Sequence, residues 1–141
     1  MFRSLEIGKH ALGILAVCGL IAWFSNAGGI RYNVKQISAP DAKALVDSGA
    51  VVVDVRGREA FHSGHIPGAI SVPLHDLESG IPAALAGAKT KSMVVYCGDG
   101  VTTGPAGTEI LNKAGYPNAV NLKSGLGGWQ KAGYPLAQGN G

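Results

Sequence analysis

The sequence has few cysteines and few charged residues. Its 141 residues include two cysteines, Cys18 and Cys97, which is too few for the disulfide framework of a small secreted domain. The four close Cys or His ligands of a structural zinc site are also missing. Charged residues make up 15% of the chain, and the formal net charge is +3. So small and scattered a positive charge does not indicate a nucleic-acid partner.

Near its start the chain has one long apolar run. Residues 11–24 carry no charge, and basic residues lie on both sides of the uncharged stretch. The run fits the core of a secretory signal peptide cleaved after Ala27, and residues 11–30 also reach the roughly 20 residues of a membrane anchor. Both interpretations stay open. We therefore expect residues 1–30 to be a signal peptide or an anchor that binds the membrane through residues 11–30 if uncleaved. The rest of the chain would then lie in the cell envelope, membrane-anchored, periplasmic or secreted.

Residues 31–141 are enough for one compact domain. Strand-like runs at 51–55, 69–72, 92–96 and 119–122 alternate with helix-like segments at 41–46, 59–62, 81–86, 104–114 and 126–131. The β-branched run at 51–55 is typical of a strand buried on both faces of a parallel sheet. This alternation predicts an α/β domain with a central parallel sheet and helices on both faces.

Cys97 directly follows the strand-like run at 92–96. The segment 97–102 reads Cys-Gly-Asp-Gly-Val-Thr, and a helix is expected to begin between Thr103 and Pro105, with a threonine as its N-cap. Two glycines let such a loop curl tightly, with its backbone N–H groups turned toward the sulfur. Those groups and the helix N-terminus favour a thiolate and bind anions. The pattern predicts an activated sulfur nucleophile beside an anion pocket.

Six short motifs extend over most of the predicted domain. They are Val-Asp-Val-Arg at 53–56, Glu-Ala-Phe at 59–61, Gly-His-Ile-Pro-Gly-Ala-Ile at 64–70, Val-Val-Tyr-Cys at 94–97, Ala-Gly-Tyr at 114–116, and the segment from Gly125 to Trp129. In this order and at this spacing they resemble the single-domain rhodaneses, a family of sulfurtransferases. The resemblance covers residues 37–136 and implies a rhodanese-like fold.

The resemblance also implies persulfide chemistry. Cys97 would take a sulfane sulfur from a donor such as thiosulfate or mercaptopyruvate and pass it to a thiophilic acceptor, cyanide or a thiol. The transferred sulfur and the donor's anionic oxygens would be held by the backbone N–H groups of Gly98, Asp99, Gly100, Val101, Thr102 and Thr103. No metal and no organic cofactor are implied. The alternative is a sulfur carrier or binding module of the same fold, which hands sulfur to a protein partner with little free turnover.

Loop length and loop charge distinguish members of this family. Its phosphatases and arsenate reductases close a longer loop with an arginine at the position held here by Thr103, so a phosphatase is disfavoured. The loop resembles those of the sulfurtransferases except at Asp99. A carboxylate there is expected to repel thiosulfate and to disfavour the thiolate, which leaves the preferred donor open.

Four other polar residues are candidates for the site. Arg58 could supply the cation that the loop lacks, or it could be a solvated surface charge. By resemblance, Asp54 and Arg56 are expected to support the fold near the pocket, with Arg56 paired to Glu59. His65 is expected to hydrogen-bond to backbone in a turn, with a direct catalytic role as the alternative.

Overall fold

The structure is a computed structural model that describes residues 30–140. The signal peptide or anchor predicted for residues 1–30 therefore lies outside the described residues, except for Ile30 at its end. Within the described part of the chain, no helix combines the length and the hydropathy that crossing a membrane requires.

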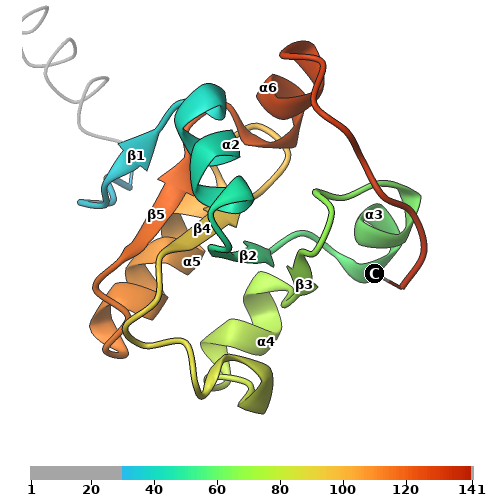
Figure 1. The fold of residues 1–141 in the computed structure, drawn as a ribbon. Coiled ribbons are helices and arrows are strands. Elements are labelled where there is room, and N and C mark those ends of the chain that lie inside the picture. The colour runs from blue at the N-terminus through green and yellow to red at the C-terminus, as the bar shows by residue number, and fades with distance from the viewer. Residues whose placement is uncertain (1–29, 141) are drawn as a thin grey trace, which may run out of the picture. The chain divides into compact units, whose positions relative to one another are not determined.

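A five-stranded parallel sheet forms the centre of the domain (Figure 1). The strand order is β1-β5-β4-β2-β3, and every neighbouring pair is parallel. The central strand β4 is buried at all four positions, as its run of apolar residues requires. The strands are β1 (Gln36–Ile37), β2 (Val51–Asp54), β3 (Ile70–Ser71), β4 (Met93–Tyr96) and β5 (Ala119–Leu122).

Helices cover both faces of this sheet, as the sequence predicts. One apolar cluster joins the sheet to α2 (Ala39–Asp47), α3 (Arg58–Ser63) and α6 (Gly125–Lys131). The other joins it to α4 (Leu74–Glu78), the 3-10 turn η1 (Ala83–Leu85) and α5 (Thr103–Lys113). The fold is therefore an α/β sandwich of three layers.

The alternation of side chains along β4 determines where Cys97 points. Val94 and Tyr96 belong to the cluster beneath α2 and α6, whereas Met93 and Val95 belong to the cluster beneath α5. Successive strand residues face opposite sides, so Cys97 continues the second series and joins the cluster on the α5 side. Strand register alone thus places the thiol against the helix that follows it.

Three elements differ from the sequence predictions. The helix expected at 81–86 is only a single 3-10 turn, and the helix α4 before it was not predicted. The edge strand β1 was not predicted either. These elements have two to five residues, which is too short for hydrophobic periodicity to reveal them.

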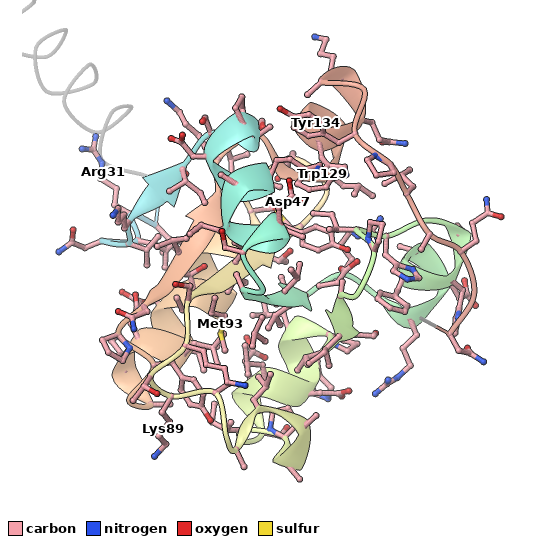
Figure 2. The ribbon with its side chains drawn as sticks, viewed as in Figure 1. Arg31, Asp47, Lys89, Met93, Trp129 and Tyr134 are labelled. Carbon is pink, nitrogen blue, oxygen red and sulfur yellow. The ribbon has the colours of Figure 1, made fainter. Side chains whose placement is uncertain are left out.

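The segment after α6 is fixed against the rest of the domain. Trp129 is buried, its indole N–H donates to the carbonyl of Pro135 (2.9 Å), and its ring meets Tyr134 edge to face. Figure 2 labels the two side chains, which lie close together. Further on, Ala137 pairs with His65 in an antiparallel bridge, so the chain end runs alongside α3 in Figure 1. The buried Trp129 thus anchors the C-terminal segment to the core.

Candidate active site

The loop 97–102 connects the carboxyl end of β4 to the first turn of α5. Cys97 is only 1% exposed, and its thiol forms no disulfide. The N-terminal turn of α6 holds the start of the loop, because the N–H of Leu126 donates to the carbonyl of Cys97 (2.8 Å) and that of Gly127 to Gly98 (3.1 Å). Ligands of parallel α/β domains bind at this end of the sheet. The loop therefore lies where the sequence predicted it.

Gly100 provides the backbone contact to the sulfur. Its N–H donates to Sγ of Cys97 at 3.2 Å. Its φ is +80°, and a Cβ at this position would overlap the backbone of Lys123. Gly98 has no such requirement, since its φ is not positive and a Cβ there would meet no atom within 4 Å. Of the two loop glycines, only Gly100 is needed for the tight curl that the sequence predicted.

Asn121, which is not among the predicted site residues, holds Gly100 in place. It lies on β5, is fully buried, and its Nδ2 donates to the carbonyl of Gly100 (2.9 Å) and to Oε1 of Gln36 (3.0 Å). Its Oδ1 is buried without a hydrogen-bond partner. A buried polar side chain inside a short apolar strand was the one signal available in the sequence.

The carboxylate of Asp99 turns into its own loop. Its Oδ1 accepts hydrogen bonds from the N–H of Val101 (2.9 Å), the N–H of Thr102 (3.2 Å) and the hydroxyl of Thr102 (3.1 Å). The thiol of Cys97 also donates to this oxygen, at 3.4 Å. These bonds, chiefly that from Val101, lower the pKa of Asp99 below its ordinary value, against a smaller opposing effect of burial.

The first turn of α5 packs against the sulfur. The helix begins at Thr103, as predicted, and a Cβ on Gly104 would lie 3.1 Å from Sγ of Cys97 and would overlap Oδ1 of Asn121. The N-cap is Thr102, but its hydroxyl donates to Asp99 and makes no cap bond to the helix. The unpaired N–H groups of this turn give the sulfur a positive environment.

Arg56 pairs with Asp54, which corrects the expected pairing with Glu59. Nη2 of Arg56 lies 2.7 Å from Oδ2 of Asp54, a fully buried carboxylate, and also donates to the carbonyl of Gly64 (2.6 Å). The reason is local, because β2 ends at Asp54 and the turn that follows brings the guanidinium back onto that carboxylate. The pair ties the end of β2 to the end of α3.

Tyr96 and His65 belong to the supporting structure around this pair. The hydroxyl of Tyr96 accepts from the N–H of Ile66 (3.1 Å), and its pKa is raised, first by burial and then by the charge of Asp54. His65 is fully buried, bonds through Nδ1 to the carbonyl of Phe61 (2.8 Å) and stacks on that ring. The backbone hydrogen bond predicted for His65 is therefore present.

Arg58 does not join the loop. Its exposed guanidinium pairs with Asp76 of α4, and among the hydrogen bonds within residues 30–140 none links it to residues 97–103. The loop thus has no arginine clamp in this arrangement. In the same part of the chain, no three His, Cys, Asp or Glu side chains gather closely enough to hold a metal ion.

Fold and site together define a class of protein: parallel α/β domains with a single cysteine in a tight loop between the central strand and a helix N-terminus. The comparisons with known proteins give the family. The profile of the Rhodanese-like domain matches residues 38–132, and the chain belongs to this family.

Two curated relatives illustrate the range of this family. The uncharacterized protein YibN of Escherichia coli K12 is 31% identical over 140 residues, which cover 94% of each chain. The thiosulfate sulfurtransferase GlpE of Pseudomonas entomophila is 35% identical over 108 residues, which cover 75% of this chain and 94% of that protein.

Solved structures agree with the fold. A thiosulfate sulfurtransferase from Pseudomonas aeruginosa superimposes with a TM-score of 0.65 at 35% identity, covering 75% of this chain and 20% of that one. A rhodanese-related protein from Thermoplasma volcanium gives 0.63 at 26% identity, covering 73% and 97%. The rhodanese-like fold and the sulfurtransferase family predicted from the sequence are thereby confirmed.

Proposed function

We propose that this domain is a sulfurtransferase that carries sulfane sulfur as a persulfide on Cys97. The donor is a small sulfur-containing molecule such as thiosulfate or mercaptopyruvate, and the acceptor is cyanide or a thiol. The observation that carries the proposal is the hydrogen bond from the N–H of Gly100 to Sγ of Cys97 (3.2 Å). The sulfur also lies against the first turn of α5. A donor group aimed at the sulfur stabilises negative charge there, both on the attacking thiolate and on the outer sulfur of a persulfide.

The chemistry needs only the thiolate and the loop. With thiosulfate, Sγ attacks the outer sulfur, the Sγ–S bond forms, the S–S bond of the donor breaks, and sulfite leaves with the electron pair. The acceptor then attacks the outer sulfur of the persulfide, and the Cys97 thiolate is restored as the leaving group. Cyanide becomes thiocyanate, and a thiol becomes a persulfide.

A second candidate function is a carrier that loads one sulfur and delivers it to a protein partner with little free turnover. Two features favour it: the nucleophile is 1% exposed, and the carboxylate of Asp99 already accepts hydrogen bonds from the loop N–H groups of Val101 and Thr102. Both would slow the repeated entry of small molecules.

One experiment separates these functions. The protein is mixed with thiosulfate, mercaptopyruvate or inorganic polysulfide, and its intact mass is measured before and after cyanide is added. The proposal expects a gain of one sulfur, about 32 Da, that is absent in Cys97→Ser. Repeated release to cyanide supports an enzyme, and fast loading with slow release supports a carrier. The absence of any gain with all three donors and with an organic persulfide would exclude both.

We further propose that residues 1–30 direct the domain to the cell envelope, as a cleaved signal peptide or as an anchor. The uncharged run at 11–24 between basic residues supports this. The test is N-terminal sequencing of the expressed protein in separated membrane and soluble fractions. A start at Gly28 indicates cleavage, and an intact Met1 in the membrane fraction indicates an anchor. An intact Met1 in the cytosol would refute the proposal.

A further inference from the structure

The carboxylate of Asp99 occupies the place that the loop offers to an anion. A single oxygen, Oδ1, accepts from two backbone N–H groups and one hydroxyl of the loop, those of Val101 and Thr102, and the thiol of Cys97 donates to it as well. Backbone N–H groups gathered in a concave loop are the usual partners of an anionic substrate oxygen. In this loop the protein supplies that oxygen itself.

Hydrogen bonds of the loop, rather than an ion pair, hold this carboxylate in the described part of the chain. Among residues 30–140 no lysine or arginine forms an ion pair with Asp99. Lys131 lines the same open groove as Asp99, and Arg58 is paired with Asp76 on α4. A second anion entering the loop would therefore compete with Asp99 for the same N–H groups and would meet its negative charge at short range.

We propose that Asp99 is the specificity-determining residue of this site, and that it selects sulfur donors that bring no anionic oxygens, namely organic persulfides of the form R–S–SH. The inference rests on the proposed persulfide chemistry at Cys97. It assigns to Asp99 the role of a built-in anion that excludes oxyanion donors such as thiosulfate.

Charge accounting for the two donors supports this selection. Thiosulfate and the Cys97 thiolate together carry three negative charges, and they give a persulfide anion and sulfite with the same total. An organic persulfide brings at most one negative charge, and its neutral form R–S–SH, the form whose outer sulfur a thiolate attacks, carries one charge together with the thiolate. In the reaction with R–S–SH, Sγ bonds to the outer sulfur and the S–S bond of the donor breaks. R–S⁻ leaves with the electron pair and takes up the proton of the donor's S–H. The products are the Cys97 persulfide anion and a neutral thiol.

The surface around the loop also suits an organic group. Val101 follows Asp99 closely in the loop, and its side chain is 69% exposed, one of the few large apolar side chains that are exposed in the described domain. An apolar side chain can contact the carbon skeleton of R, whereas it offers nothing to a sulfonate.

The test compares two donors on the full-length chain. The rate constant for sulfur loading of Cys97, followed by intact mass, is measured with thiosulfate and with the persulfide of N-acetylcysteine methyl ester. Wild type, Asp99→Asn and Asp99→Ser are compared. The matched control is Asp47→Asn, which removes one exposed carboxylate from α2 at the other end of the sheet.

We expect the ratio of the thiosulfate to the persulfide rate constant to rise about tenfold or more in both Asp99 variants, as removal of one nearby charge predicts, and to stay constant in Asp47→Asn. An unchanged ratio in the Asp99 variants overturns the inference while leaving the proposed function intact, provided that either donor loads Cys97. If neither donor loads any of the proteins, the proposed function itself fails.

A second measurement uses only the wild-type protein and does not depend on the folding of variants. Inorganic sulfate, an oxyanion that does not attack persulfides, is added during loading by the organic persulfide. Because Asp99 already fills the anion position, we expect no slowing of loading by sulfate. Competitive inhibition by sulfate would show that the loop is open to oxyanions, and it would overturn the inference.

Discussion

The side-chain amide of Asn121 donates to the backbone carbonyl of Gly100, 2.9 Å away and 21 positions earlier in the chain. The same peptide segment presents the N–H of Gly100 to Sγ of Cys97. A fully buried side chain of β5 therefore fixes the loop residue that contacts the sulfur of Cys97. Asn121 is a positioning residue, since it acts on the sulfur through Gly100.

This relationship predicts that Asn121→Leu slows sulfur loading of Cys97 by about tenfold. Without Asn121 the N–H of Gly100 is no longer held toward the Cys97 thiolate, and a hydrogen bond to a charged group is worth about 1.5 kcal/mol or more. The matched control is Asn112→Leu. Asn112 also donates from Nδ2 to two carbonyls, those of Tyr116 and Ala119, outside the loop. The two variants are compared at equal fractions folded, with the thiolate absorbance near 240 nm as a second readout. An equal loss of loading in both variants would reduce Asn121 to a structural role.

The two loop glycines should respond differently to alanine. Gly100→Ala places a Cβ against the backbone of Lys123 at a positive φ, so we expect sulfur loading to be lost. Gly98→Ala meets no atom within 4 Å, so we expect a folded protein that still loads sulfur. Intact mass after incubation with a donor measures both. Loss of loading in both variants would contradict the assigned geometry.

The two arginines after β2 should differ in their effect on stability. Arg56→Met leaves the buried carboxylate of Asp54 unpaired, and we expect the free energy of unfolding to fall by roughly 3–5 kcal/mol. Arg58→Met breaks an exposed pair with Asp76 and should cost about 1 kcal/mol or less. Urea unfolding measures both. If Arg58→Met keeps its stability but loads thiosulfate much more slowly, Arg58 serves the loop as a cation after all.

The effect of Asp99 should not depend on pH in the usual assay range. Its pKa is lowered, chiefly by the Val101 N–H, so the carboxylate is charged from about pH 5 upward. Its hydrogen bonds to the loop are thus fully present at neutral pH and are lost only as the pH falls through the lowered pKa. We expect the ratio of thiosulfate loading rates, Asp99→Asn over wild type, to stay constant from pH 6 to 9. A ratio that falls steadily toward pH 6 would show that another group is titrating.

The sequence predicted the three-layer fold and the position of Cys97, because both follow from local patterns. Buried strands are continuous apolar runs, and a Cys-Gly-x-Gly segment between a strand and a helix allows little other than a tight loop. The choice of hydrogen-bond partners could not be predicted in the same way. Whether an N–H group of the loop points to the sulfur or to Asp99 depends on the combined backbone torsions of several successive residues.

Long-range partners were missed for a related reason. Asn121 contacts Gly100 because β5 lies beside β4 in the sheet. The order of strands in a sheet cannot be predicted from the spacing of strand-like runs in the sequence. The pairing of Arg56 with Glu59 was expected from resemblance, while the short turn after β2 returns the guanidinium to Asp54. In both cases the geometry of a turn or a sheet decided between side chains that the sequence presented as equivalent.

The burial of Cys97 has a consequence for the lifetime of the loaded protein. A persulfide on an exposed cysteine is lost to the first free thiol it meets, because thiolates attack sulfur–sulfur bonds readily. In the proposed function, the 1% exposure of Cys97 means that a sulfur bound to Sγ would be shielded by the loop and by the first turn of α5. Release would then require the loop to open, so an acceptor able to open it, rather than the most abundant thiol in the surroundings, would receive the sulfur.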